Sequence, residues 1–424
     1  MLIEFRVRNF RSIRDEQVLT LTAGKDKTFA SSHLIPAGKS YPETLKSAVV
    51  YGANASGKSN LIEAFEYMRY RIILPINTRD IFQNLPKFFQ YSSFKLNKEN
   101  RTVPSTFEVT FVLDKVRYQY GFSVLGDRIT EEWLYAYFAD KPQVWFSRKI
   151  DKEKNADVYK FSAYLTGHKK TWEKATRADS LFLSTASSLN SEQLGKVFQW
   201  FLLQVDIFSK MRQVTIAHSN YKQLENEDNK QILLNFIKSA DINIVDIGFK
   251  KDRAYPQKNI TDERDIPGKE ANKRIIFYHE AENGEKVAFD YNEESDGTLR
   301  FFEFTFYVLD SLVSGGVLFV DELESNLHPL LVRSLVELFN SNLNKNGAQL
   351  VFTTHDSNLL SGALFRRDQI WFIEKDRTGA SLLYPLTDFS PRREEALEKG
   401  YLEGRYGAIP FLFDMNFPVE ANAE

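Results

Sequence analysis

The sequence has no cysteine among its 424 residues. This absence excludes disulfide bonds, thiolate metal sites and cysteine nucleophiles, and it suits the reducing environment of the cytosol. No stretch approaches the roughly 18 consecutive apolar residues of a membrane-spanning helix, and the N-terminus lacks a basic region followed by an apolar signal core. We therefore predict a cytoplasmic protein without a membrane partner.

The chain also has little net charge and no repeated units. Its formal net charge is −2, so no global basic field points to nucleic acid, although a local basic patch would permit contact with DNA or RNA. Adjacent basic residues occur in several pairs, but such pairs are usually solvated faces. No internal repeat, low-complexity tract or sustained heptad pattern is present, which argues against a long coiled-coil arm.

The pattern of apolar residues divides the chain into three parts. Residues 1–150 are rich in alternating strands, among them a hairpin predicted around Asp114 and Lys115. Residues 151–275 are mainly helical and end in an exposed, charged loop. Residues 276–424 alternate helices with strands, which implies a parallel sheet covered on both faces. The sequence therefore predicts an α/β protein with a mixed or parallel sheet, a β-rich N-terminal lobe and a helical insertion.

The segment Gly52-Ala-Asn-Ala-Ser-Gly-Lys-Ser59 matches the pattern G-x-x-x-x-G-K-[ST] in full. The apolar residues 48–51 before it predict a buried strand, and the apolar spacing after it predicts a helix that runs to about Leu74. Strand, loop and helix in this order are the setting of a phosphate-binding loop. Gly52 and Gly57 let the backbone turn tightly, so that its N–H groups can point at phosphate oxygens.

This loop predicts ATP and Mg²⁺ as cofactors. Lys58 should reach the β- and γ-phosphates, and the hydroxyl of Ser59 should hold Mg²⁺. We expect nucleotide contacts from seven residues of the loop and the helix start: Gly52, Asn54, Ser56, Gly57, Lys58, Ser59 and Asn60.

Two carboxylates follow the apolar run Val317–Val320, which predicts a buried strand. Ligands of parallel sheets bind at the carboxyl ends of the strands. Asp321 can hold Mg²⁺ through water, and Glu322 can polarise a water for attack on the γ-phosphate. A strand that ends in Asp-Glu is also a common turn, but its combination with a phosphate-binding loop favours catalysis.

The distance between the two motifs is informative. Lys58 and Asp321 are 263 residues apart (321 − 58), which is far too long for a compact recombinase-like or ring-ATPase core. The guanine-reading motif Asn-Lys-x-Asp of GTPases is absent. A wide separation that encloses a β-rich and helical insert resembles the layout of ABC-type ATPases of the SMC/RecF class.

Three further segments resemble that class. Ser295-Asp-Gly297, at the start of an apolar helix, resembles the ABC signature, and an ordinary helix cap is the alternative. The resemblance implies that Ser295 and Gly297 contact the γ-phosphate held by the opposite subunit, in an ATP-sandwiched homodimer. Residues 324–329 resemble the D-loop, and His355, one strand later, resembles the switch histidine that senses the γ-phosphate.

Two nucleotide contacts stay open at this point. Asn9-Phe-Arg-Ser12 resembles the N-terminal motif in which a basic residue approaches the nucleotide, so Arg11 is the candidate, and an ordinary surface arginine is the alternative. Gln90 is the best-placed glutamine to reach Mg²⁺, and Gln83 is a second candidate. An ordinary glutamine at a strand edge, without a role in metal binding, is an equal alternative.

Across nearly the whole chain the resemblance narrows. Residues 1–12, the phosphate-binding loop and the closing segment 400–410 resemble prokaryotic AAA-domain ATPases of the RloA/AbiLi group, which are similar to overcoming-lysogenization-defect ATPases without a fused nuclease. The resemblance implies a role in phage defence beside a separately encoded effector, frequently of RloB type with a Toprim-like nuclease fold. Only 69 residues follow His355 (424 − 355), without an obvious Toprim carboxylate set, so we expect no nuclease here. Arg405 could face a partner or a neighbouring subunit.

The sequence therefore predicts an ABC-type ATPase that dimerises around ATP and Mg²⁺ and switches a partner. Residues 1–150 would form the N-terminal ATPase lobe, residues 151–275 a helical insertion and residues 276–424 the C-terminal ATPase lobe. One alternative is a RecF-like module whose main task is to bind DNA. Another is a scaffold that assembles with ATP and hydrolyses it rarely.

Overall fold

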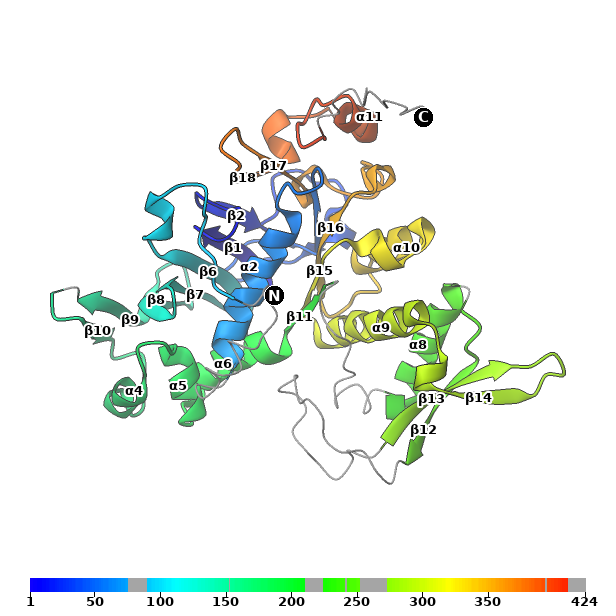
Figure 1. Ribbon diagram of the computed structural model, residues 1–424, viewed down its shortest axis with the longest axis horizontal. Coiled ribbons are helices and arrows are strands. Elements are labelled where there is room, and N and C mark those ends of the chain that lie inside the picture. Colours follow the sequence, from blue (N-terminus) through cyan, green and yellow to red (C-terminus); the bar gives the residue numbers. More distant parts are fainter. Residues whose placement is uncertain are drawn as a thin grey trace, which may run out of the picture.

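The structure is a computed structural model. It describes residues 1–74, 90–151, 153–209, 224–240, 242–251, 273–392 and 395–410. Two large sheets and the helices on their faces form most of the molecule (Figure 1).

Seven antiparallel strands form the first sheet, in the order β10-β9-β8-β7-β6-β1-β2. The strands are β1 (Leu2–Arg8), β2 (Gln17–Thr20), β6 (Ser105–Leu113), β7 (Val116–Leu125), β8 (Arg128–Tyr137), β9 (Gln143–Asp151) and β10 (Ala156–Phe161). The predicted hairpin joins β6 and β7, and Asp114 and Lys115 both have positive φ, as a tight two-residue turn between twisted strands requires.

Strand β1 lies between β6 and β2 in this sheet. Its alternating charged residues face neighbouring strands instead of an open edge. Arg6, for example, lies 2.6 Å from Glu4, 3.1 Å from Glu16 and 3.8 Å from Glu108. The alternation of charged and apolar residues in β1 therefore indicates that one face of the sheet is polar.

Six strands form the second sheet, in the order β11-β15-β16-β5-β17-β18. The strands are β5 (Ser47–Tyr51), β11 (Val205–Phe208), β15 (Val317–Val320), β16 (Gln349–Thr354), β17 (Ile370–Lys375) and β18 (Ser381–Pro385). All neighbours are parallel except β17 and β18. The predicted α/β class is thus confirmed, with a parallel sheet that carries one antiparallel edge strand.

Helix α2 (Lys58–Ile73) lies between the two sheets (Figure 1). The ring of Phe65 contacts Phe5 of the first sheet at 4.9 Å between centroids and Phe319 of the second sheet at 4.2 Å. Burial of such a side chain contributes about 1.5–3 kcal/mol. One column of three rings therefore joins the first sheet, the helix and the second sheet.

The opposite face of the six-stranded sheet is covered by α9 (Asp296–Ser314), α10 (Pro329–Phe339) and α11 (Leu397–Leu402) (Figure 1). In β5, Ala48 and Val50 face the core that contains α2, whereas Val49 and Tyr51 face the core that contains α9 and α10. A strand that is apolar on both faces needs cover on both, which explains its unbroken apolar sequence.

The segment 151–275, predicted as one mainly helical insertion, is distributed over three sheets. The helices α4 (Lys169–Ala175), α5 (Phe182–Ser188) and α6 (Glu192–Leu203) pack on the seven-stranded sheet, where Trp200 stacks on Phe111 with 4.0 Å between centroids. Strand β11 then enters the six-stranded sheet beside β15. Large aromatic side chains on these helices pack against the sheet, and this packing fixes the place of the helices.

A small separate unit follows. It consists of α8 (Glu227–Ser239) and a three-stranded antiparallel sheet of β12 (Asp246–Lys251), β13 (Lys273–Glu280) and β14 (Lys286–Asp290). Helix α8 packs against α9, where Phe236 stacks on Phe301. The unit is thereby attached to the helix that leads into β15.

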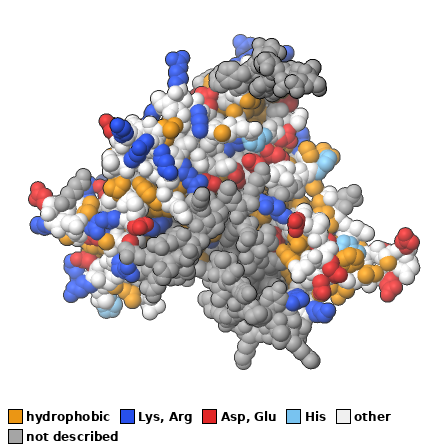
Figure 2. All heavy atoms as spheres, viewed as in Figure 1, with side chains coloured by type: hydrophobic (Ala, Val, Ile, Leu, Met, Phe, Trp, Pro, Cys, Tyr) orange, Lys and Arg blue, Asp and Glu red, His pale blue; other side chains and the backbone are white. Residues whose placement is uncertain are grey.

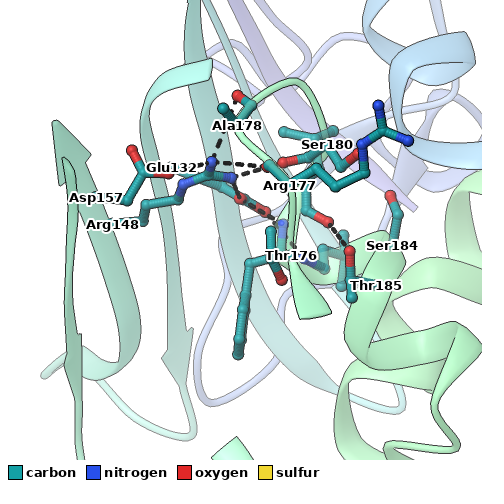
Figure 3. A network of polar contacts seen from close by, with 12 residues as sticks. Glu132, Arg148, Asp157, Thr176, Arg177, Ala178, Ser180, Ser184 and Thr185 are labelled. Carbon is teal, nitrogen blue, oxygen red and sulfur yellow. Dashed lines mark hydrogen bonds and ion pairs between the residues drawn. The ribbon is translucent and has the colours of Figure 1, made fainter. Parts of the chain in front are cut away.

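A buried ionic network attaches α5 to the seven-stranded sheet (Figure 3). Glu132 accepts hydrogen bonds from the N–H groups of Phe182 and Leu183 at the start of α5. The guanidinium of Arg148 lies 3.7 Å from Glu132 and donates to Asp157 at 2.7 Å, and the side chains of Arg148 and Glu132 are fully buried. Burial raises the pKa of Glu132, while Arg148 and the helix N–H groups oppose that rise.

The remaining elements are short. They are α1 (Ala30–His33), β3 (Leu34–Ile35) and β4 (Thr44–Leu45), and the single turns η2 (Glu99–Arg101), η3 (Tyr291–Glu293), η4 (Leu323–Asn326), η5 (Ser357–Leu359), η6 (Arg367–Gln369) and η7 (Leu386–Phe389). Within the described parts of the chain, no helix has the length and apolar character to cross a membrane.

Candidate nucleotide site

The phosphate-binding loop connects β5 to α2, as predicted, and its two glycines are required by close packing. A Cβ on Gly52 would lie within 2.7 Å of Ser56 Oγ and still closer to the carbonyl oxygen of Ile373. Gly57 has a φ of +116°, and a Cβ there would collide with Ser381. A larger residue at either position would displace the loop, since backbone and strand atoms cannot give way.

Lys58 is buried, and its ammonium group contacts the loop that precedes it. Nζ donates to the carbonyl oxygens of Gly52 at 2.7 Å and Ala53 at 2.9 Å, and it lies 3.4 Å from Nδ1 of His355. Burial lowers the pKa of Lys58 to about 8, against an opposing effect of nearby carboxylates, first Glu322. The charge of Lys58 is therefore held in a partly desolvated position, where an anionic ligand would stabilise it.

Two serine side chains that sequence reasoning missed, Ser12 and Ser381, support the phosphate-binding loop. Ser381 Oγ, in β18, lies 2.6 Å from the carbonyl oxygen of Ser56 and 2.8 Å from Ser12 Oγ. Asn60 donates to Ser12 Oγ at 2.6 Å. Ser12 and Ser381 are far from the loop in sequence, so no local pattern could have identified them.

The two predicted carboxylates lie at the carboxyl end of β15, beside the end of β16. Thr353 Oγ1 donates to Asp321 Oδ1 at 2.7 Å and accepts from the N–H of Glu322 at 2.7 Å. Glu322 has a φ of +51°, a left-handed conformation that is unusual for this residue type. Thr353, another residue that we did not predict, thus fixes one carboxylate and the backbone of the next.

His355 lies between the two motifs. Its Nε2 is 4.0 Å from Oε1 of Glu322, and its Nδ1 faces Lys58. Because a lysine ammonium can only donate, Nδ1 is the acceptor, and the proton of the neutral ring is on Nε2, toward Glu322. The structure therefore brings Lys58, His355 and Glu322 together at one edge of the sheet.

The donor set fits a nucleotide with Mg²⁺. Lys58 and the open N–H groups of the loop suit phosphate, and Ser56 Oγ is buried without a partner within the described residues. No group of three His, Asp or Glu side chains is placed to hold a metal in the described parts of the chain. Ser59 and Asp321 would therefore supply few ligands, which suits Mg²⁺, since this ion usually takes most of its ligands from phosphate and water.

Arg11 and Gln90, the two candidates that stayed open, belong to neighbouring segments. Arg11 pairs with Glu63 of α2 and is partly buried, which lowers its pKa to about 10. The backbone N–H of Arg11 donates to the carbonyl oxygen of Ser92 at 2.8 Å. Gln90 is exposed and precedes Ser92 by two residues. Gln83 lies outside the described residues.

The signature-like segment stands at the exposed start of α9. Ser295 caps the helix by accepting from the N–H of Thr298 at 3.1 Å, and both Ser295 and Gly297 are exposed. Both partners of the Ser295 hydroxyl belong to Thr298 of its own helix. Within one copy of the described chain, no hydrogen bond joins Ser295 to the phosphate-binding loop.

Arg405 lies in the closing segment, where it donates to Glu395 at 2.6 Å and remains 55% exposed. The same carboxylate accepts from Tyr406, at 2.7 Å. Tyr401 of this segment stacks on Phe372 of β17. The segment therefore packs on the strand beside β5, and Arg405 points outward from it.

A family model described as "AAA domain, putative AbiEii toxin, Type IV TA system" matches residues 47–361. Among solved structures, the chain is similar to the SMC head domain from Thermotoga maritima, with 11% sequence identity, a TM-score of 0.38 and coverage of 91% of this chain and 98% of that chain. It is also similar to an SMC head bound to the C-winged helix domain of ScpA, with 11% identity, a TM-score of 0.39 and coverage of 90% and 96%. No curated protein matches the sequence.

Proposed function

Because the chain belongs to the family of AAA domains described as "putative AbiEii toxin, Type IV TA system", we propose that it binds ATP with Mg²⁺ and hydrolyses the γ-phosphate as an ABC-type ATPase. The observation that carries this proposal is the contact of His355 with both Lys58 and the Glu322 side of the site. This contact joins the phosphate-binding loop to the carboxylate pair. Residues far apart in the sequence thereby meet where ligands of a parallel sheet bind.

The residues divide the chemistry between them. Lys58 and the loop N–H groups bind the β- and γ-phosphates, and Ser59 with Asp321 holds Mg²⁺, which neutralises phosphate charge when bound. Glu322 orients a water and accepts its proton, while the Nε2–H of His355 donates toward the γ-phosphate. Catalysis then consists mainly of positioning and electrostatic stabilisation.

The active unit in this proposal is a dimer. Ser295 and Gly297 present a hydroxyl and helix N–H groups to solvent at the start of a 19-residue helix, and such an end attracts anions. The resemblance of this segment to the ABC signature implies that the nucleotide contacted by Ser295 would be bound by a second copy. Two ATP molecules would thus lie between two chains and hold them together.

The proposed cellular role is control of a separately encoded effector in phage defence. The family description, with its toxin of a toxin–antitoxin system, supports a defence role, and the resemblance to the RloA/AbiLi group points to an effector of RloB type. ATP-dependent dimerisation would change the surface that such an effector binds.

The test of this function is hydrolysis and assembly in one preparation. The purified chain should release phosphate from ATP, and Glu322→Gln should retain ATP and accumulate as a dimer in sedimentation experiments. A chain that neither hydrolyses ATP nor changes its mass with ATP would contradict the proposal. A dimer that forms with ATP while wild type and Glu322→Gln turn over equally slowly would support the scaffold alternative.

A second candidate function, nucleic-acid binding, is favoured by one surface. Lys and Arg side chains gather over the part of the molecule that carries β1, β2 and β6 (Figure 2). Exposed Arg8 lies there, and buried Asn9 bonds to Asn100 and Val103, which fixes the neighbouring loop. That loop carries three exposed basic residues, Lys95, Lys98 and Arg101. Binding through this patch would weaken steeply with added salt.

A further inference from the structure

The carboxylate of Glu324 lies directly behind the switch histidine. Its Oε1 accepts the backbone N–H of His355 at 2.6 Å, whereas its Oε2 is buried and has no hydrogen-bond partner among the described residues. A bond from a backbone N–H to an ionised carboxylate is about twice as strong as one between neutral groups. This bond joins η4, which follows the catalytic carboxylates, to the end of β16.

Other buried polar atoms surround the same place. The hydroxyl of Tyr51 and Oδ2 of Asp356 also lack partners among the described residues. Burial raises the pKa of Tyr51 well above its ordinary value, and the charges of Asp356 and Glu324 are among those that add to the rise. Because Tyr51 is the last residue of β5 and directly precedes Gly52, the strand of the phosphate-binding loop reaches this cluster as well.

The backbone at His355 decides where the imidazole lies. Both ring contacts, with Lys58 and with Glu322, depend on it, and neither is short: 3.4 Å and 4.0 Å. A displacement of about 1 Å in a catalytic group can cost about 100-fold in rate. The bond from the N–H of His355 to Glu324, at 2.6 Å, is shorter than either ring contact.

We propose that Glu324 is a positioning residue for the γ-phosphate switch: its carboxylate holds the backbone of His355 so that the imidazole stands between Lys58 and Glu322. This inference rests on the proposed function. Glu324 itself does not act as the base, because one of its oxygens is occupied by the N–H of His355 and the other is buried. The side chain of Glu322 is 25% exposed and can reach water.

The experiment compares Glu324→Ala, Glu324→Gln and the matched control Glu337→Ala, which removes an exposed glutamate of α10 that pairs with Arg333. Glu324→Ala should lower kcat for ATP about 10- to 100-fold with little change in the Kd for ATP. Glu324→Gln should recover most of the rate, since an amide oxygen still accepts the N–H of His355. Glu337→Ala should leave both values unchanged.

Two further measurements separate positioning from other roles. In a His355→Ala background, Glu324→Ala should cause no additional loss of kcat, because it would act through a side chain that is already absent. Hydrogen exchange at the His355 amide should become faster in Glu324→Ala and remain slow in the control, and this readout needs no hydrolysis.

Either of two results would overturn the inference. One is an unchanged kcat and unchanged amide exchange in folded Glu324→Ala. The other is a loss of kcat that does not follow the positioning role. Such a loss would have the same size with and without His355, or would be as large in Glu324→Gln as in Glu324→Ala. If wild type shows no ATPase activity at all, the proposed function fails, and the amide exchange still decides whether Glu324 holds His355.

Discussion

Nζ of Lys58 lies 3.4 Å from Nδ1 of His355, although the two residues are 297 positions apart in the sequence. The contact places the end of β16 against the phosphate-binding loop, and it orients the remaining N–H of the imidazole toward Glu322. A nucleotide that binds Lys58 must therefore enter a position that His355 already borders.

Removal of the Lys58 ammonium should abolish tight binding of ATP. Lys58→Ala removes a charge from a buried anion site, and a charge-assisted hydrogen bond is worth about 1.5–3 kcal/mol, so the Kd for ATP should rise at least about 10- to 100-fold. Titration calorimetry with ATP and Mg²⁺ measures the change. Lys46→Ala is the control, because Lys46 is also buried but donates to Ser341 at the other end of β5. Equal affinity in wild type and Lys58→Ala would refute the assignment of the loop.

Binding of ATP should take up a proton above pH 8. The pKa of Lys58 is lowered to about 8 by burial, so the free protein loses this charge as pH rises through 8, whereas bound phosphate favours the charged form. At pH 8.5 roughly 0.8 proton should be taken up per site. Calorimetry in two buffers of different ionisation enthalpy measures the uptake. Lys58→Arg stays charged and should show none, and uptake of the same size in that variant would assign the proton to another group.

Substitution Glu322→Gln should separate binding from turnover. The amide keeps the size of the side chain but cannot accept the proton of water, so kcat should fall by about 100-fold or more while ATP still binds. Phosphate release under saturating ATP gives the rate, and Glu337→Gln on α10 serves as the exposed control. Turnover equal to wild type would show that another group is the base.

Loss of Arg148 should destabilise the protein strongly. Arg148→Met leaves Glu132 buried without its cation, so the free energy of unfolding should fall by about 3–5 kcal/mol. Lys149→Met is the matched control on the same strand, because Lys149 forms an exposed pair with Glu131, and exposed pairs contribute little to stability. Urea unfolding followed by tryptophan fluorescence compares the two. Losses of equal size would show that the network in Figure 3 contributes little.

Local patterns in the sequence predicted the parts of the site that are formed by neighbouring residues. The loop before α2, the strand β15 with its two carboxylates and the capped start of α9 each depend on spacing within about 20 residues, and the structure has these elements where we expected them. The roles of their residues remain predictions. What local spacing cannot reveal is which distant segments meet.

Long-range packing explains the differences. Ser381 donates to the carbonyl oxygen of Ser56, although the two residues are 325 positions apart. Glu324 follows β15 and contacts His355, which follows the neighbouring strand β16. The amphipathic helices of the segment 151–275 predict one helical insertion. In the structure, however, Trp200 packs on Phe111 of the seven-stranded sheet, and β11 enters the six-stranded sheet. These choices depend on which apolar faces are open in the rest of the fold.

The claim that a second copy completes the site is tested most directly by mixing two inactive variants. Lys58→Ala removes the lysine of its own phosphate-binding loop. Ser295→Arg blocks the helix end that would contact the nucleotide bound by the other copy. A mixed dimer contains one complete site, in which a loop with Lys58 lies opposite an intact Ser295. With random pairing and independent sites, half of the dimers are mixed, so an equimolar mixture should regain about one quarter of wild-type ATPase activity. A mixture as inactive as either variant alone, with both variants folded and mixed dimers present, would contradict the account.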